Sequence, residues 1–215
     1  MSRTAFVFCA GGPARSALFR VPDGALVIAA DAGVAEAERH GLHVDLLVGD
    51  LDSADPAAVA RVEAGGGIVE RYPADKDASD LELALAAAAV AADVGEIVVV
   101  GGDGGRLDHL VGNLLVLASD RFAHIRIDAV LGEALVHVVR RTREIHGDVG
   151  ELISLFALGG PARGVTTEGL YWTLNDDELQ PGSTRGLSNL FAAPTARIVV
   201  GDGVVVAVRP GREPA

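Results

Sequence analysis

The N-terminal half of the sequence alternates between short apolar runs and segments with helical character, and this alternation constrains the fold more than any other feature. The apolar runs contain few polar residues, which is typical of strands covered on both faces. Strands separated by helices favour a parallel sheet, so we predict an α/β domain of Rossmann-like type. Its expected strands are residues 4–10, 25–30, 45–48, 67–72 and 96–100, and its expected helices are residues 34–40, 56–64, 79–92 and 107–119.

The C-terminal part shows a different pattern, with short β-type runs separated by turns and no convincing helix. The segment Gly201-Asp202-Gly203, between the last two runs, is typical of a hairpin turn. We therefore predict a small all-β sandwich as a second domain. The expected domains are residues 1–121 and residues 122–215. The β-type runs are residues 124–131, 134–139, 151–158, 196–200 and 204–208.

Composition excludes several classes of protein. The chain has 215 residues, of which 49% are hydrophobic, so it can bury a core. Its formal net charge of −12 argues against nucleic acid or an anionic membrane as a partner. No apolar stretch is long enough to cross a membrane, and no signal-like segment begins the chain. With a single cysteine, Cys9, the chain is consistent with a reducing compartment, and we expect a cytoplasmic protein.

Acidic residues follow four successive strands of the expected sheet. Because the carboxyl ends of parallel strands meet at one edge, we expect these carboxylates to converge there. Carboxylates in such a group repel one another unless a cation lies among them, and hard oxygen ligands suit Mg²⁺. The sequence therefore predicts a magnesium site shared with substrate phosphates, although we expect Asp103 and Asp55 to cap helices or close turns instead. The residues that follow the strands are Asp31, Asp50, Asp52, Asp75, Asp77, Asp80, Asp103 and Asp108.

The densest cluster lies at residues 75–82 and contains Lys76, the only lysine of the chain. Ser79 and Glu82 have the spacing of a capping box, which places Asp80 in the first turn of the following helix, where the helix dipole favours an anion. Taken alone, these charges fit a solvated turn equally well. The repetition of the pattern at the other strands favours a site.

A glycine-rich loop, residues 101–105, precedes Arg106 and the last helix of the first domain. Glycines let backbone amides approach an anion, and Arg106 can donate a fork of hydrogen bonds to a phosphate. The loop lacks the Lys-Ser/Thr pair of a Walker A motif and is a weak signal without its context.

Trp172, in the second domain, is the only tryptophan of the chain. A lone tryptophan is more often a core residue, but beside the polar Ser188-Asn189 turn its ring can hold a heteroaromatic or cationic ligand.

Taken together, these blocks resemble the thiamine pyrophosphokinases (thiamine diphosphokinases) of bacterial type over nearly the whole chain. Each block is modest alone, and their order makes the resemblance specific. Ala32, where a second glycine is usual, and Leu51, where phenylalanine is frequent, depart from the pattern without touching a polar role. The blocks are Asp31-Ala32-Gly33, Val48-Gly49-Asp50-Leu51-Asp52-Ser53, residues 75–80, Gly104-Gly105-Arg106-Leu107-Asp108-His109, Gly169-Leu170-Tyr171-Trp172 and residues 182–189.

The resemblance implies a fold, a reaction and a set of roles. It implies an α/β catalytic domain, a thiamine-binding β-sandwich and a homodimer with active sites between subunits. The reaction would be Mg²⁺-dependent transfer of diphosphate from ATP to the hydroxyl of thiamine, giving thiamine diphosphate and AMP. Asp50, Asp52 and Asp80 would be catalytic and metal-binding, with Asp31 in support. ATP would be positioned by Lys76, Asp77, Ser79, Arg106 and Asp108, and thiamine by Trp172, Ser188 and Asn189.

The physical chemistry agrees with this assignment, because the thiazolium cation of thiamine suits an acidic cleft and an aromatic face. Diphosphate transfer needs mainly in-line positioning and neutralised phosphate charge, so we assign no general base. We expect His109 to help hold the glycine-rich loop. Two alternatives stay open. One is a diphosphokinase of the same fold acting on another alcohol, such as a hydroxymethylpterin. The other is a non-catalytic nucleotide or thiamine sensor.

Overall fold

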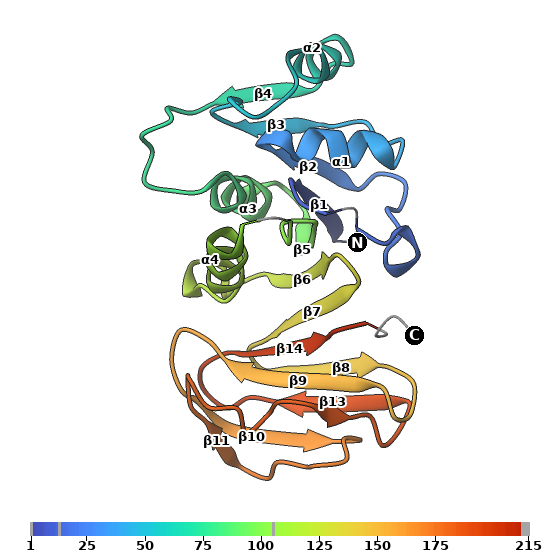
Figure 1. The fold of residues 1–215 in the computed structure, drawn as a ribbon, viewed down its shortest axis with the longest axis vertical. Helices are drawn as coiled ribbons and strands as arrows, with labels where there is room; N and C mark the ends of the chain where they lie inside the picture. The colour runs from blue at the N-terminus through green and yellow to red at the C-terminus, as the bar shows by residue number, and fades with distance from the viewer. Residues whose placement is uncertain (1, 13, 105, 212–215) are drawn as a thin grey trace. The chain divides into compact units, whose positions relative to one another are not determined.

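The structure is a computed structural model that describes residues 2–12, 14–104 and 106–211. The chain forms two compact units, shown in Figure 1. The first unit contains the chain up to Val116 together with His124–Glu133, and the second contains Leu117–Ala123 together with the chain from Ala134 onward. Among the described residues, no helix combines the length and the apolar character that a membrane crossing requires.

The first unit is built on a parallel sheet. Its neighbouring strands all pair in parallel, and its central strands are buried, with Ala5, Val7, Phe8 and Ile28 each fully excluded from solvent. This burial explains the uninterrupted apolar runs. The strands lie in the order β6 (Arg126–Leu131), β5 (Val94–Val100), β1 (Arg3–Cys9), β2 (Leu26–Ala30), β3 (Leu46–Gly49) and β4 (Ile68–Arg71), as Figure 1 shows.

Four helices connect or follow these strands: α1 (Val34–Arg39), α2 (Pro56–Ala64), α3 (Asp80–Val90) and α4 (Leu107–Leu117). Two of them begin at side-chain caps. The carboxylate of Asp55 accepts a hydrogen bond from the Ala57 N–H at 3.0 Å, and the Ser79 hydroxyl accepts one from the Glu82 N–H at 3.2 Å. The predicted caps at Asp55 and Ser79 are therefore confirmed.

The order in which successive strands are added reverses between β1 and β5, which lie side by side and parallel at the centre of the sheet. From β1 the chain proceeds through β2 and β3 to β4 on one side, and from β5 it proceeds to β6 on the other. The loops after β1 and β5 therefore lead to opposite sides of the sheet and border a crevice at the carboxyl edge, where open α/β sheets bind ligands. Glycines let these loops approach closely, since a Cβ on Gly104 would lie 2.4 Å from the Gly12 nitrogen.

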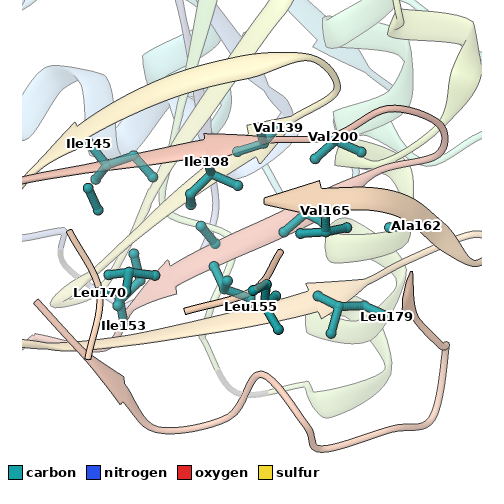
Figure 2. Packing of buried hydrophobic residues seen from close by; sticks show 14 of the residues in the cluster. Val139, Ile145, Ile153, Leu155, Ala162, Val165, Leu170, Leu179, Ile198 and Val200 are labelled. Atoms are coloured by element: carbon teal, nitrogen blue, oxygen red, sulfur yellow. The ribbon is translucent and has the colours of Figure 1, made fainter. Parts of the chain in front are cut away.

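The second unit consists of two antiparallel sheets with a common apolar core (Figure 2). Ile153 and Leu155 of one sheet and Val165 and Ile198 of the other are each at most 2% exposed. The predicted small all-β domain is confirmed. The strands that this unit contributes to the ten-stranded sheet lie in the order β12 (Asn189–Leu190), β9 (Leu152–Ala157), β14 (Val205–Arg209), β7 (Ala134–Val139). The four-stranded sheet has the order β11 (Asp177–Leu179), β10 (Ala162–Glu168), β13 (Thr195–Val199), β8 (Thr142–His146).

Two expectations about this half of the chain were wrong. Residues 124–131, placed in the second domain by the boundary at residue 121, lie in the first unit, because they contain β6, which pairs in parallel with β5. The segment Gly201-Asp202-Gly203 is not a hairpin turn, because β13 and β14 lie in different sheets. It is a connection packed on residues 161–163, and the Arg163 N–H donates to the Asp202 carbonyl at 2.9 Å. The expected β-type runs also left out β8, β10, β11 and β12.

Candidate functional site

A cleft of about 400 Å³ lies at the carboxyl edge of the parallel sheet, at the point where the strand order reverses. One wall, which we call the carboxylate wall, comes from the ends of β2 and β3 and the start of α3. The opposite wall, which we call the arginine wall, comes from the loop after β5 and the start of α4. The residues that line the cleft include Cys9, Gly11, Asp31, Ser53, Lys76, Ser79, Asp80, Gly102, Arg106, His109 and Asn113.

Three aspartates of the carboxylate wall converge as predicted. Asp31, Asp50 and Asp52 each offer a carboxylate oxygen, and these oxygens lie within 4.8 Å of one another. Asp31 follows β2 and is only 9% exposed, whereas Asp50 and Asp52 follow β3 at the rim. The parallel pairing of β2 with β3 places both strand ends at the same edge, which is why residues about twenty positions apart in the sequence meet here.

The backbone at this wall is specialised for close approach. Gly49 has a φ of 154°, and a Cβ there would lie 3.1 Å from the Asp31 Cβ and 3.1 Å from Asp80 Oδ1. A larger residue would therefore force these carboxylates apart. Asp31 has a φ of 46°, a conformation that aspartate tolerates better than most residues, and the positive φ does not fall on Ala32. The methyl group of Ala32 is thus accommodated, as expected.

Lys76 joins the cluster from the segment that precedes α3. Its Nζ lies 3.1 Å from Asp50 Oδ2 and 3.1 Å from Asp80 Oδ1, and its side chain is only 12% exposed. The lysine thus bridges a carboxylate that follows β3 and one at the start of α3. Asp75 and Asp77 are exposed and do not line the cleft, so the cluster at residues 75–82 contributes Lys76, Ser79 and Asp80 to the cleft but not its other two aspartates.

The electrostatics of the carboxylate wall fit a site for a hard cation. Burial raises the pKa of Asp31, and the negative charges of Asp80, Asp50 and Asp52 raise it further. The hydrogen bond from Lys76 lowers the pKa of Asp50. Burial opposes the charge on Lys76, but its hydrogen bonds to Asp80 and Asp50 outweigh this and raise its pKa. Asp31 Oδ1 is buried and accepts no hydrogen bond within the described part of the chain. These oxygens suit Mg²⁺.

The arginine wall is organised differently. Arg106 donates two hydrogen bonds to Asp108, from Nε to Oδ1 at 3.2 Å and from an Nη to Oδ2 at 2.6 Å. Both side chains are about two-thirds exposed. The hydrogen bond from Arg106 lowers the pKa of Asp108 to about 2, so this carboxylate stays ionised at physiological pH. Arg106 lines the cleft, while Gly105 of the same loop lies outside the described residues.

Asp103 does not join the other carboxylates. It packs between the loop after β1 and the turn after β6, since a Cβ on Gly132 would lie 2.5 Å from Asp103 Oδ2 and one on Gly11 would lie 3.1 Å from Oδ1. This position agrees with the expectation that Asp103 belongs to a turn and not to the carboxylate cluster. The reason is that β5 lies across the crevice from β2 and β3, and its loop turns toward β6.

Two polar residues near the cleft escaped the sequence analysis. Asn113, in the middle of the apolar helix α4, donates a hydrogen bond to the Gly102 carbonyl at 2.9 Å and so holds the glycine loop. Glu36 of α1 is 2% exposed, accepts a hydrogen bond from the Ala14 N–H at 3.2 Å, and contacts His40 Nε2 at 3.2 Å. Glu36 thereby anchors the loop after β1. Asn113 could have been recognised in the sequence because it is a polar residue among apolar neighbours. Glu36 could not, because it looks like an ordinary surface residue of a helix.

In the second unit, Trp172 is exposed, which rules out the alternative that it is a core residue. Trp172 and Tyr171 are 57% and 67% exposed, and their rings meet edge to face with centroids 4.8 Å apart. Asn189 is buried and fixes the backbone of Trp172. Its Oδ1 accepts a hydrogen bond from the Trp172 N–H at 3.1 Å, and its Nδ2 donates one to the Trp172 carbonyl at 2.7 Å. Ser188 is exposed and has a φ of 58°.

These features define a class of protein: a two-domain chain that combines a parallel-sheet unit with an acidic ligand cleft and a β-sandwich with an exposed aromatic pair. Profiles of one family match both parts. The profile described as "Thiamin pyrophosphokinase, catalytic domain" matches residues 21–129, and "Thiamin pyrophosphokinase, vitamin B1 binding domain" matches residues 136–205. The chain therefore belongs to the thiamin pyrophosphokinase family.

Individual relatives agree with this placement. Thiamine pyrophosphokinase 1 of rice is 30% identical over 164 residues, which cover 72% of this chain and 61% of the rice protein. The chain thus spans about three-fifths of that relative. Thiamine pyrophosphokinase of Bacillus subtilis is 26% identical over 182 residues, covering 83% of this chain and 80% of the relative.

Solved structures establish the fold. The crystal structure of the Bacillus subtilis thiamine pyrophosphokinase superposes with a TM-score of 0.84 at 23% identity, covering 98% of this chain and all of that one. Thiamin pyrophosphokinase from Candida albicans superposes with a TM-score of 0.78 at 13% identity, covering 95% of this chain and 89% of the other. The predicted α/β domain followed by an all-β domain is the arrangement that these proteins share.

Proposed function

We propose that this protein is a thiamine diphosphokinase, a transferase that moves the diphosphate group of ATP to the hydroxyl of thiamine and releases thiamine diphosphate and AMP. The observation that carries the proposal is the convergence of Asp31, Asp50 and Asp52 within 4.8 Å at the reversal point of the sheet. This cleft lies in the part of the chain that matches the family's catalytic profile, and the exposed aromatic pair lies in the part that matches its vitamin-binding profile.

The carboxylate wall would hold Mg²⁺ through Asp50, Asp52 and Asp80, with Asp31 supporting them. Its donors are carboxylate oxygens, and the unpartnered buried Oδ1 of Asp31 adds negative charge that a cation would balance. When bound, Mg²⁺ supplies neutralisation of phosphate charge at the transferring group. Asp50 and Asp52 follow directly after β3, which ends at Gly49, so the end of this strand brings them close to Asp31.

The ATP phosphates would lie between the two walls. Arg106 lines the cleft, and it can exchange its bonds with Asp108 for a two-pronged contact with a phosphate, since both side chains are exposed. Lys76 would provide a second positive charge from the opposite wall. Ser79 stands at the start of α3, whose backbone N–H groups favour an anion. Asp77 and Asp108 would then act indirectly, Asp108 by orienting Arg106 and Asp77 by orienting the loop that carries Lys76.

Thiamine would bind through its rings and its positive charge. Trp172 offers an exposed aromatic face for the thiazolium cation, and Ser188 offers an exposed hydroxyl close to it in the sequence. The side chain of Asn189 is engaged with the backbone of Trp172, so we assign it the role of positioning the tryptophan. A loose transition state requires little removal of the hydroxyl proton, which is why no general base is assigned.

We also propose that the protein works as a cytoplasmic homodimer. Leu107, Val111 and Leu115 of α4 are 75%, 49% and 51% exposed, and their spacing of four residues places them on one face of the helix. An exposed apolar stripe of this kind favours contact with a second protein surface. The net charge of −12 and the buried thiol of Cys9 are consistent with the cytoplasm.

The test is turnover with ATP and different alcohols, with and without Mg²⁺. We expect equal amounts of AMP and thiamine diphosphate, formed only with the metal.

A second test uses a variant of the aromatic pair. Trp172→Ala should raise the KM for thiamine about tenfold, while the KM for ATP changes little. The matched control is Val149→Ala, which trims an equally exposed apolar residue of the same unit and should leave both constants unchanged. Turnover with a hydroxymethylpterin but not with thiamine would instead indicate a diphosphokinase for another alcohol. Thiamine binding without turnover would indicate a non-catalytic sensor.

A further inference from the structure

Lys76 holds a position that the proposed reaction does not by itself explain. Its ammonium lies 3.1 Å from Asp50 and 3.1 Å from Asp80, so it is paired with two of the three carboxylates assigned to Mg²⁺. It is also the one lysine among 18 basic residues of the chain. The inference below rests on the proposed cation site and concerns how that site is controlled.

We propose that Lys76 and a divalent cation compete for the carboxylates of Asp50 and Asp80, and that binding of the cation releases the Lys76 ammonium toward the nucleotide phosphates. An ammonium group and a divalent cation repel each other when they share the same carboxylates. The lysine stem is flexible, and Lys76 lines the cleft, so a rotation of its side chain suffices to redirect the ammonium.

The choice of lysine at this position supports an exchange. Elsewhere the chain uses arginine as its basic residue, and arginine forms two-pronged bonds with carboxylates, as Arg61 does with Glu38 at 2.8 Å and 2.8 Å. Lysine is a compact point charge with rotatable donors, and it makes a single contact with each carboxylate. Lys76 can therefore leave Asp50 and Asp80 without breaking a fixed two-pronged geometry.

The exchange couples the two ligands of the cleft. The cation displaces Lys76 from the carboxylate wall, and the displaced ammonium adds a positive charge for the phosphates, so the cation strengthens nucleotide binding. By thermodynamic reciprocity the nucleotide strengthens cation binding by the same factor. Without the lysine, the cation should bind more tightly to the free protein, and part of this mutual strengthening should disappear.

The first test is calorimetric titration of Mn²⁺ into the full-length protein without nucleotide. Lys76→Met should bind Mn²⁺ about tenfold more tightly than the parent, a factor within the usual range for coupled sites. The matched control is Arg126→Met, which removes the same charge at the opposite edge of the sheet, where Arg126 pairs with Glu96 and Asp128. This control should change the affinity less than twofold. An affinity of Lys76→Met that equals or falls below that of the parent would overturn the proposal.

The second test observes the lysine directly. Because the chain has one lysine, labelling lysine with ¹³C at Cε gives a single side-chain NMR signal. The signal should shift when Mg²⁺ is added and shift again with a non-hydrolysable ATP analogue. A signal that does not respond to Mg²⁺ at concentrations that saturate the site refutes the exchange. Neither test involves thiamine or turnover, so the exchange can stand if thiamine is not the acceptor, and it can fail while diphosphate transfer to thiamine is confirmed.

Discussion

The two walls of the cleft are built from the same sequence pattern, an acidic residue soon after a buried parallel strand, yet they differ in structure. On the carboxylate wall, Asp31, Asp50 and Asp52 are drawn together, and Lys76 bridges Asp50 to Asp80. On the arginine wall, Asp108 pairs with its near neighbour Arg106 in solvent. The pattern alone therefore does not decide whether carboxylates form a site.

The difference follows from strand order. β2 and β3 are adjacent and carry their loops to the same side of the reversal point, so their terminal carboxylates meet. β5 lies on the other side of that point, and its loop continues toward β6. Gly49 completes the contrast, because its missing side chain lets Asp31 and Asp80 approach. We expect the carboxylate wall to carry the chemistry and the arginine wall to contribute mainly to binding.

The largest expected effect comes from Asp80→Asn. Removing this charge should lower kcat about 100- to 1000-fold with the fold retained, because the carboxylate wall loses charge while the side-chain volume is kept. Circular dichroism would check the fold. Asp55→Asn is the matched control: it removes an aspartate charge near the same edge, and asparagine still caps α2. If the kcat of Asp80→Asn stays above a tenth of the control, this wall does not carry the chemistry.

The next effect is that of Arg106→Met on the arginine wall. Loss of a charged phosphate contact should raise the KM for ATP about tenfold, with a smaller change in kcat. Steady-state kinetics with ATP as the varied substrate separates the two constants. A loss of kcat as large as that of Asp80→Asn, with unchanged KM, would mean that the two walls do not differ in their roles.

A third prediction concerns stability: here the substitution is expected to stabilise the protein, whereas the two preceding substitutions impair activity. Burial and neighbouring carboxylates raise the pKa of Asp31, so its ionised form destabilises the folded protein above that raised pKa and ceases to do so below the ordinary pKa of an aspartate. Asp31→Asn should therefore raise Tm at pH 8 in the presence of EDTA, by roughly 2 °C, and the gain should vanish toward pH 4. Thermal unfolding at both pH values tests this. A lower Tm for the variant at pH 8 would show that the charge is compensated in the folded state.

The smallest effect is expected for Asp108→Asn. Exposed ion pairs contribute little to stability, so Tm should stay within about 1 °C of the parent. The KM for ATP should change by less than about threefold, since Arg106 remains able to meet a phosphate. Because the pKa of Asp108 is about 2, its ionisation should not contribute to any pH dependence of the KM above pH 4. A large fall in Tm would assign this pair a structural role on the arginine wall.

Much of the first unit was predictable because its information is local. Apolar runs and helix starts indicate strands and helices, as at α2, whose bounds, Pro56–Ala64, match the expected residues, and parallel pairing then brings Asp31 to Asp50. The partners of a strand are not local. Residues 126–131 have the same β-type pattern whether they join β5 or a sandwich, so their placement could not be predicted.

The site was predictable to the extent that strand ends determine it. That Lys76 bonds to Asp50, 26 residues away, depends on how the segment after β4 folds back over β3, which no spacing reveals. The resemblance implied a role in thiamine binding for Asn189, and the structure adds that its side chain forms hydrogen bonds with the backbone of Trp172. Polar residues that support a site and polar residues that contact a ligand have the same appearance in a sequence.

The identity of the products tests the account most directly. A mixture of the protein, ATP, thiamine and Mg²⁺ can be followed by ³¹P NMR, which distinguishes AMP, ADP, thiamine monophosphate and thiamine diphosphate. The account predicts that AMP and thiamine diphosphate appear together in equal amounts, and that the same mixture with Asp80→Asn remains nearly unchanged over the same time. Formation of ADP with thiamine monophosphate, or no reaction of thiamine in the parent mixture, would contradict it.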